Sequence, residues 1–424
     1  WEDFGLKSWS YNKILPYFKK IENWSGGENQ YRGSLGPLPI NQSKNNNPLF
    51  KAFLNASSEA GHKINPDMNG EYQEGFGMFD TTIHKGERAS VSRYYLNPAK
   101  KRRNLNIFSN SFVEKIIFEG KKAIGVEVKI KDKVEKIYAE KEVILSGGSI
   151  NSPQLLMLSG IGDSDHLKEK GIAVIQNLKG VGKNLQDHLE TYIQQECKTT
   201  DTLYKYTKLI PKVMAGIQWF LNKSGPCSQS FLEAGGFAKS SHDRKIPNIQ
   251  FHFFPSFVIN HGKVNASSHG YQLHASPNQP KSRGSITLNS SNPYDYPKIL
   301  FNYLEHEDDL KQTRECIRVA RKILSQPSLA KYSGKEIGPG FDQQNDDQLN
   351  DYIRSNAETA YHPCGTCKMG IDDTAVVDEN LKVKGIQNLR VVDASVMPEI
   401  PSANLNAPTL MIAEKASDII CNNN

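Results

Sequence analysis

Residues 143–156 read VILSGGSINSPQLL, an apolar run followed by two glycines and the start of a helix. The run at 143–145 is typical of a buried strand. Gly147 and Gly148 predict a tight turn, and Pro153 suits the first turn of the following helix. Nucleotide-binding α/β folds are built from a strand that passes through such a turn into a helix. The stretch therefore predicts an α/β domain with a ligand near its turn.

The residues before this stretch alternate as β-strands do. Four further strands are predicted, namely NLNIFSN (104–110), FVEKIIFEG (112–120), AIGVEVKIK (123–131) and KVEKIYAEK (133–141). Short turns separate them, so we expect a β-meander that feeds the buried strand. Residues 190–350 mix helical and strand patterns and form a different region.

Length and composition exclude several classes of protein. A chain of 424 residues can form two or three cores, and its net charge of +6 comes from 52 basic and 46 acidic residues spread along it. No aromatic-studded basic face accompanies them, so nucleic acid is not an expected partner. The chain contains no run of eighteen apolar residues, so no membrane span is predicted. Six Asn-X-Ser/Thr sequons and a start at Trp1, without a leader, favour a secreted glycoprotein from which an upstream segment was removed.

A second ligand-binding signal lies in residues 393–409. Asp393 ends an apolar strand, which places its carboxylate at the carboxyl edge of a sheet. Asn404 and Asn406 stand just before Pro408, which suits the start of a helix. The positive end of that helix can stabilise an anion or an electron-rich ring. An ordinary capped helix explains this loop equally well. No GxGxxG fingerprint or phosphate loop is present, so the predicted nucleotide-binding half is incomplete.

The segment YHPCGTCKMG (361–370) allows three interpretations. Its CxxC spacing is that of a redox dithiol or of half a zinc site, and His362 could serve as an acid or base. A zinc site needs a second ligand pair, and none has suitable spacing, so no metal is expected. A thioredoxin-like dithiol opens a helix, whereas this motif lies in a glycine-containing loop. A lone histidine in a loop is most often structural, so the residues alone leave the question open.

Longer segments resemble a known family in order over nearly the whole chain. They are SWSYNKILPYFKKIEN (8–23), residues 143–172, LKGVGKNLQDHL (178–189), PKSRGSITL (280–288), YHPCGTCKMG and residues 376–420. These motifs resemble the glucose-methanol-choline (GMC) family of FAD-dependent oxidoreductases.

The resemblance implies an α/β (α+β) fold of two domains. Residues 100–190 and 355–424 are expected to form a Rossmann-like FAD-binding domain that is discontinuous and incomplete. Its first segment, with the glycine-rich FAD motif, is expected to be missing, so an N-terminal segment of the same protein is the implied partner. Residues 1–99 and 191–354 are expected to form a substrate-binding domain and cap, built on an antiparallel sheet flanked by helices.

The resemblance also assigns site residues. His362 matches the catalytic histidine near the flavin N5, and Asn404 matches the second active-site position. His188, in the NLQDHL motif, is expected to be structural packing near the domain junction. Cys367 matches a common cysteine, whereas Cys364 departs from the family pattern, and a disulfide between these two stays open.

Six positions are implied to contact FAD. Val113 is expected to meet the adenine through its backbone. The pyrophosphate and ribityl chain are assigned to Asp393 and Ala394. The remaining positions, beside the pyrimidine side of the isoalloxazine, are Asn406, Pro408 and Thr409.

The implied reaction is oxidation of a primary or secondary alcohol by hydride transfer to the flavin N5. His362 would take the hydroxyl proton, and Asn404 would orient the oxygen. Residues 190–350 carry no diagnostic charged clamp, which favours a neutral alcohol substrate. Two alternatives are a hydroxynitrile lyase of the same fold and a non-enzymatic relic or fragment.

Overall fold

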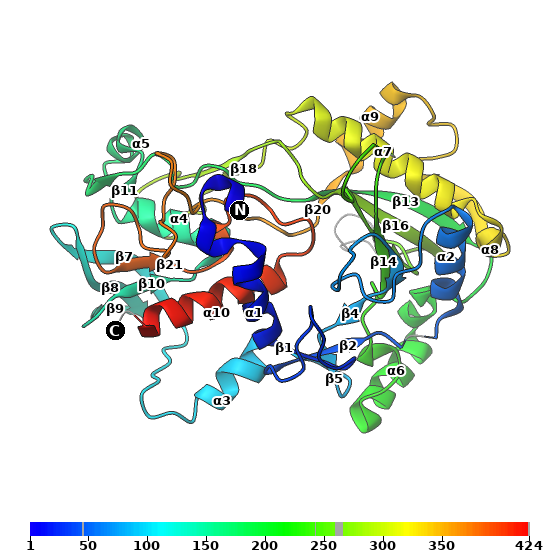
Figure 1. Cartoon of the computed structure of the whole chain (residues 1–424), viewed down its shortest axis with the longest axis horizontal. Coiled ribbons are helices and arrows are strands. Elements are labelled where there is room, and N and C mark those ends of the chain that lie inside the picture. The colour runs from blue at the N-terminus through cyan, green and yellow to red at the C-terminus, as the bar shows by residue number, and fades with distance from the viewer. Residues whose placement is uncertain (45, 242, 259–265, 423–424) are drawn as a thin grey trace.

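The computed structural model describes residues 1–44, 46–241, 243–258 and 266–422. Figure 1 shows two groups of elements side by side along the long axis of the molecule. One group surrounds α4 and α10, and the other surrounds a twisted antiparallel sheet. The site described below lies where segments from both groups meet.

The first group contains the strand, turn and helix of residues 143–156. Its main elements are α1 (Tyr11–Ile21), β7 (Ser111–Glu119), β8 (Lys122–Ile130), β9 (Lys133–Tyr138), β10 (Val143–Leu145), α4 (Gly148–Leu158), α5 (Ser164–Glu169), β21 (Leu389–Val391) and α10 (Asn406–Asn422). Strands β7, β8 and β9 form the antiparallel meander, and β10 pairs in parallel with β21. The predicted strand at 104–110 is wrong, because this segment lies exposed and no strand of the described chain pairs with it.

The second group is built on the antiparallel sheet expected for the substrate domain. Its elements are α2 (Pro48–Glu59), β3 (Gly75–Met78), β13 (Leu189–Cys197), α6 (Leu209–Asn222), β14 (Ala234–Ala238), β15 (Ile249–Phe254), β16 (Gly270–Pro277), α7 (Glu307–Leu324), α8 (Pro327–Ala330), β19 (Ser333–Gly338), α9 (Asp346–Asn356) and β20 (Glu358–Thr359). The sheet runs in the order β19-β13-β16-β15-β14-β3, with β20 beside β13. All of these pairings are antiparallel.

Several smaller elements complete the fold. They are β1 (Glu22–Trp24), β2 (Leu38–Gln42), β4 (Asp80–Thr81), β5 (Ile83–His84), β6 (Glu87–Arg88), α3 (Asn97–Ala99), β11 (Ile161–Gly162), β12 (Gln176–Asn177), β17 (Ser285–Thr287) and β18 (Lys298–Leu300). Strand β1, which follows α1, pairs in parallel with β2, and β2 pairs in antiparallel fashion with the short β4. These pairings link the N-terminal helix to the sheet region.

Two separate hydrophobic cores divide the chain differently from the expected domain boundaries. Trp9, Ile21 and Leu38 pack in the core that also contains β21 and α10, and α1 lies against α10. The second core begins at Leu49 in α2 and includes β13 to β16 and α7. About the first forty residues therefore pack with the segments 100–190 and 355–424, whereas 1–99 was expected to belong to the substrate domain.

Helix α4 contains Pro153 in its interior rather than in its first turn. A proline there has no N–H to donate to the carbonyl four residues earlier, which is that of Ser149. Thr366 supplies the missing bond, since its Oγ1 donates to the Ser149 carbonyl at 2.6 Å. Ser149 Oγ in turn donates to the Pro363 carbonyl at 2.8 Å. The loop that carries His362 is therefore fixed to the start of α4.

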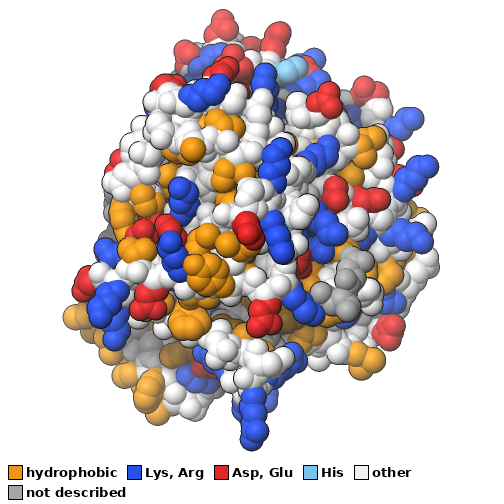
Figure 2. Space-filling model, turned by 90° about the vertical axis from the view of Figure 1, so that its left-hand side faces the viewer, with side chains coloured by type: hydrophobic (Ala, Val, Ile, Leu, Met, Phe, Trp, Pro, Cys, Tyr) orange, Lys and Arg blue, Asp and Glu red, His pale blue; other side chains and the backbone are white. Residues whose placement is uncertain are grey.

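Surface charges are mixed on the face that Figure 2 presents. Lysine and arginine side chains are interspersed there with aspartate and glutamate, so this face carries no continuous basic surface. Within the described ranges, no helix has the length and apolarity needed to cross a bilayer.

Candidate active site

The segments 186–188 and 360–364 pair with each other although they lie far apart in the sequence. Gln186 and Cys364 exchange both backbone hydrogen bonds, with N–O distances of 3.0 and 2.9 Å. The Ala360 amide donates to the His188 carbonyl at 2.9 Å. Asp187 Oδ1 accepts from the backbone amide of His362 at 2.7 Å. This pairing holds the side chains of His188 and His362 next to each other.

The two imidazoles are connected through their Nδ1 atoms, 3.0 Å apart. His188 Nε2 lies 3.0 Å from the carbonyl oxygen of Asn278, which can only accept, so Nε2 of His188 carries a proton. Burial lowers the pKa of His188 to about 3, so the ring is neutral and its Nδ1 accepts. His362 therefore donates from Nδ1 and leaves a lone pair on Nε2.

Asn404 lies at that lone pair. Its Nδ2 is 3.0 Å from His362 Nε2, and its Oδ1 accepts from Gln250 Nε2 at 2.9 Å. The same amide nitrogen of Gln250 lies 3.2 Å from His252 Nε2. Since Gln250 has two N–H groups, it can donate to both, which fixes the side-chain amide of Asn404 with its nitrogen toward His362.

Burial also lowers the pKa of His362 below its ordinary value, although the carboxylates of Asp187 and Glu190 act in the opposite direction. Burial lowers the pKa of His252 to about 4. At neutral pH both rings are therefore uncharged, and the lone pair on His362 Nε2 accepts from Asn404 Nδ2.

A buried acidic group lies beside this row of side chains. Glu190 lies on β13, two residues after His188. Its Oε1 is 3.0 Å from His274 Nδ1. Burial alone would raise the pKa of Glu190, but His274 holds it below its ordinary value. Glu190 is therefore a carboxylate at neutral pH.

The cysteines of the CxxC motif are both fully buried and free. Burial raises the pKa of Cys364 and of Cys367 above that of an ordinary thiol, so neither is a reactive thiolate. Both pack in the first core. No disulfide joins them, and among the described residues no group of histidine, cysteine and acidic side chains could hold a metal ion.

Asp393 ties the end of β21 to the glycine turn. Its Oδ2 accepts from the Gly148 amide at 2.9 Å and from Ser152 Oγ at 2.6 Å, and its Oδ1 accepts from the Ser395 amide at 2.8 Å. Gly148 has a φ of 80°, a conformation that favours glycine. The carboxylate of Asp393 thereby fixes the strand-turn-helix unit predicted from the sequence.

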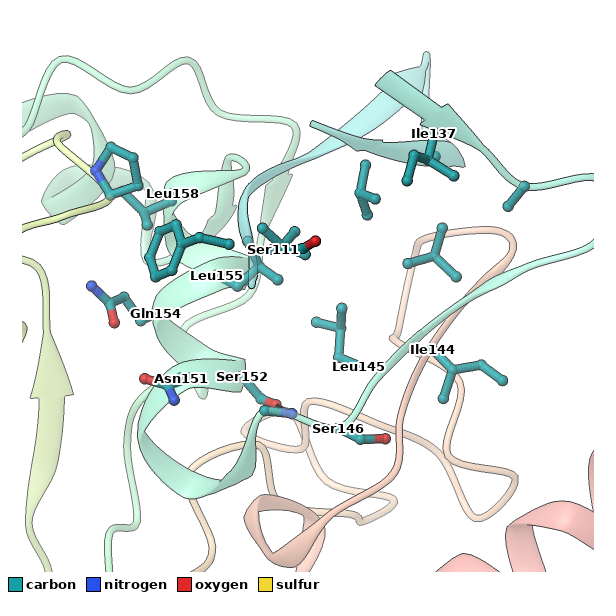
Figure 3. Close-up of a pocket in the computed structure, with 18 of the residues that line it drawn as sticks. Ser111, Ile137, Ile144, Leu145, Ser146, Asn151, Ser152, Gln154, Leu155 and Leu158 are labelled. Carbon is teal, nitrogen blue, oxygen red and sulfur yellow. Dashed lines mark hydrogen bonds between the residues drawn. The ribbon is translucent and has the colours of Figure 1, made fainter. Parts of the chain in front are cut away.

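A cavity of about 650 Å³ opens beside this turn. Figure 3 shows Leu155 and Leu158 of α4 on one side of it and Ile137 of β9 on another. Val113 belongs to its wall, as do Gly147 and Ser152. The walls combine apolar side chains with the backbone of the glycine turn, and the volume suits a small organic ligand.

A second cavity, of about 590 Å³, opens at the N-terminus of α10. Asn404, Asn406 and Pro408 belong to its lining. Thr409 is turned back into the helix, since its Oγ1 donates to the Leu405 carbonyl at 2.7 Å. Ala394 packs against the first core. Of the eight predicted site residues, His362 and Asn404 are therefore in contact, Asp393 binds the glycine turn, Val113 lines the first cavity, and Asn406 and Pro408 line the second. Ala394 and Thr409 line neither cavity.

Three residues at the site have roles beyond those expected from the sequence. His188 is not packing alone, because it contacts His362 directly. On sequence grounds His252 could line a pocket, although a structural role is the simpler expectation, and Gln250 has no assigned role. Their spacing of two in a strand predicts a shared face. His261, which could line the same pocket on sequence grounds, lies outside the described residues.

The paired histidines, the glycine turn and the two cavities fit a flavin-dependent oxidoreductase of CH–OH donors, and comparison with known proteins gives the family. Models described as GMC oxidoreductase match residues 1–190 and 280–413. An oxygen-dependent choline dehydrogenase of Brucella ovis is 48% identical over 422 residues, covering 99% of this chain and 77% of the relative. The mitochondrial choline dehydrogenase of Homo sapiens is 49% identical, covering 99% and 71%. This chain belongs to the GMC oxidoreductase family.

A formate oxidase variant from Aspergillus oryzae, studied for FAD modification, has a similar structure. The two structures superpose with a TM-score of 0.93 at 25% sequence identity. The superposition covers 100% of this chain and 80% of the formate oxidase chain. FAD is the cofactor of this family. The residues present fit it: the first cavity is of a size for an aromatic base and sugar, and the amide-rich start of α10 suits an electron-rich ring.

The comparisons correct several expectations. The N-terminal GMC model matches residues 1–190, so the expectation that this chain lacks the N-terminal region, with a separate segment as its partner, is not borne out. The expected secretion and glycosylation find no support, since the relatives are bacterial or mitochondrial choline dehydrogenases. The relatives at 48 and 49% identity are both named as dehydrogenases. They therefore favour an oxidoreductase over the two alternatives, a hydroxynitrile lyase and a non-enzymatic relic.

Proposed function

We propose that this protein oxidises choline, or a closely similar quaternary ammonium alcohol, to the aldehyde. In this proposal His362 is the base and Asn404 orients the substrate oxygen. The main support for this reaction is the position of His362 Nε2 and Asn404 Nδ2, which lie 3.0 Å apart. The names of the relatives at 48 and 49% identity support the substrate.

An alcohol oxygen can replace the direct hydrogen bond between these two nitrogen atoms and bind both of them. Its O–H would donate to the lone pair on His362 Nε2, and the oxygen would accept from Asn404 Nδ2–H. As the carbinol carbon loses its hydride, the hydroxyl proton passes to His362, which becomes an imidazolium and keeps its Nδ1–H bond to His188. When bound, FAD supplies the acceptor for that hydride.

His188 does not take the proton further in this scheme. Burial lowers its pKa to about 3, and its Nε2 proton is held by the Asn278 carbonyl, so the abstracted proton stays on His362. His188 acts as a positioning residue, since its Nδ1 keeps the proton of neutral His362 on Nδ1 and the lone pair toward the substrate.

The charges around the second cavity favour a cationic substrate over the neutral alcohol expected from the sequence. Arg32 is buried and is bonded to three carboxylates, at 3.0 Å from Glu22, 2.6 Å from Asp67 and 2.8 Å from Asp80. This group carries a formal charge of −2, and Glu22 and Asp80 line the cavity with Asn404. A cavity with excess negative charge concentrates cations.

Aromatic side chains also line this cavity. They are Tyr11, Phe18 and Tyr31. Aromatic faces attract quaternary ammonium groups through cation–π interactions. Carboxylates and aromatic rings together therefore suit a trimethylammonium group better than a sugar or a steroid.

Anaerobic mixing of the FAD-loaded protein with substrate tests the proposal, because hydride transfer bleaches the flavin absorbance. Choline should bleach it, and 3,3-dimethylbutan-1-ol, which has the same shape without the charge, should be at least roughly 10-fold poorer in kcat/KM, as about 1.4 kcal/mol of cation recognition predicts. Equal rates would contradict the cationic substrate. Failure of choline and of a panel of primary alcohols to bleach the flavin would contradict alcohol oxidation itself.

A further inference from the structure

Helix α6 (Leu209–Asn222) presents its apolar side outward. Seven large apolar side chains on it are each between 47% and 76% exposed, namely Leu209, Ile210, Val213, Met214, Ile217, Phe220 and Leu221. Figure 1 shows α6 at the periphery of the molecule, beyond the edge of the sheet group. An exposed apolar surface of this extent on one helix marks an interaction site.

The helix is held to the protein by its other side. At 100° per residue, the seven exposed side chains occupy one continuous arc, whereas Ala215 and Trp219 point to the opposite side. Ala215 is buried, and Trp219 Nε1 donates to the Gly86 carbonyl at 2.7 Å. A surface helix ordinarily buries its apolar side, so the orientation of α6 is inverted.

The charged residues in the segment that carries α6 are all basic. No aspartate or glutamate occurs between Asp201 and Glu233, whereas this interval contains four lysines, at 205, 208, 212 and 223. Lys223 forms an ion pair with Glu87 at 3.2 Å, and the other three lysines are exposed. An apolar arc with flanking lysines matches the composition of helices that lie in the interface of a lipid bilayer.

We propose that α6 docks this protein on the surface of an anionic lipid bilayer, with the helix axis parallel to the membrane plane. Its 14 residues extend over only about 21 Å, shorter than a bilayer core of about 30 Å, so the helix lies on the membrane and does not cross it. The apolar arc enters the boundary between headgroups and acyl chains, and the lysines contact the anionic headgroups.

A second copy of the chain is a less suitable occupant. A two-fold interface places the same patch of both subunits face to face, which would bring the lysines of one copy toward those of the other. An anionic membrane compensates these charges instead. The charge complementarity therefore favours lipid over self-association.

Co-sedimentation of the full chain with vesicles tests the proposal. Vesicles of phosphatidylcholine with one-third phosphatidylglycerol should bind at least roughly 10-fold more protein than phosphatidylcholine alone, and high salt should weaken that binding. The double variant Ile210→Glu with Phe220→Glu should lose it. The matched control carries Tyr296→Glu and Phe341→Glu, which replace exposed aromatic residues elsewhere, and should bind like the wild type.

Several outcomes would overturn the proposal. Equal, weak binding of the wild type to both kinds of vesicle would do so, as would an equal loss of binding in the control. Light scattering provides the third test, because it measures the oligomeric state. If the wild type is a dimer that does not bind vesicles and the α6 variant is a monomer, a second copy of the chain covers the helix. These measurements depend on neither flavin content nor choline oxidation, so their outcome is independent of the proposed function.

Discussion

His188 Nδ1 lies 3.0 Å from His362 Nδ1, and His188 Nε2 lies 3.0 Å from the Asn278 carbonyl oxygen. Since that carbonyl can only accept, this one backbone group determines which nitrogen carries the proton on each of the two rings. The chain Asn278, His188, His362 and Asn404 therefore orients the lone pair that the proposed reaction needs.

Replacing His188 tests this arrangement. In His188→Leu the Nδ1–H of His362 loses its acceptor, and we expect the rate of flavin reduction to fall about 10- to 100-fold, part of the typical contribution of a general base. In His188→Asn the amide oxygen can replace Nδ1 as the acceptor, so the rate should stay within a few-fold of the wild type. Stopped-flow absorbance measures both, with flavin content and thermal unfolding as checks on folding. Equal rates in the two variants would contradict the positioning role.

His362→Ala should lower the rate of flavin reduction by roughly two to four orders of magnitude, because it removes the base itself. The loop around His362 is held by backbone bonds to the segment 186–188, so FAD content should be retained. Cys364→Ser is the matched control in the same loop, and its turnover should remain within a few-fold. If the serine variant were inactive and the alanine variant active, the choice of His362 over the CxxC motif would be wrong.

Asn404 and Gln250 should behave as a unit. Asn404→Ala removes a donor to the substrate oxygen and should lower the rate by about 10- to 1000-fold. Gln250→Met removes the donor that fixes the amide of Asn404 at 2.9 Å and should lower the rate less. In the double variant the second change should add almost nothing, because its effect acts through Asn404. Additive losses in a double-mutant cycle would show that Gln250 acts elsewhere.

The histidine pKa shifts predict how the enzyme responds to acid. Burial depresses the pKa of His362 and His188 in the folded protein, whereas both should titrate near about 6.5 when unfolded. As pH falls below about 6.5, the unfolded state takes up protons first, so stability is present above that pH and is lost toward pH 3. Each group contributes a slope of up to about 1.4 kcal/mol per pH unit.

Two measurements check this pH dependence. Denaturant unfolding between pH 7 and 5 should show a shallower slope in His188→Asn than in the wild type. The kcat/KM profile should lose activity only below the ordinary histidine pKa, since His362 must be neutral to accept a proton. An acid limb above pH 7 would contradict the depressed pKa.

Thr366 and Pro153 should be coupled in stability. Thr366→Val leaves the buried Ser149 carbonyl without a donor and should cost about 1–3 kcal/mol. In a Pro153→Ala background, the new amide at 153 can donate to that carbonyl, so the same change should cost less than about 1 kcal/mol. Chemical unfolding of the four proteins measures the coupling, and identical costs in both backgrounds would exclude the exchange of donors.

The sequence alone determined the local features of this protein. The strand, glycine turn and helix of 143–156 formed in the predicted order, although the helix begins before the turn expected at Pro153. An apolar run, a residue with φ of 80° and a helix start are properties of neighbouring residues. The motifs of the GMC family were equally readable, and His362 and Asn404 do lie in contact.

Only the tertiary structure decided which residues surround His362. His188 precedes it by 174 positions and Gln250 precedes Asn404 by 154, and backbone pairing between distant segments brings them together. The same holds for the cores: Trp9 and Leu38 could have packed on either group of elements, and the contact of α1 with α10 placed them in the first. Side-chain periodicity shows which face of an element is apolar, but the partner that covers it, or leaves it open as on α6, depends on the packing of the whole chain.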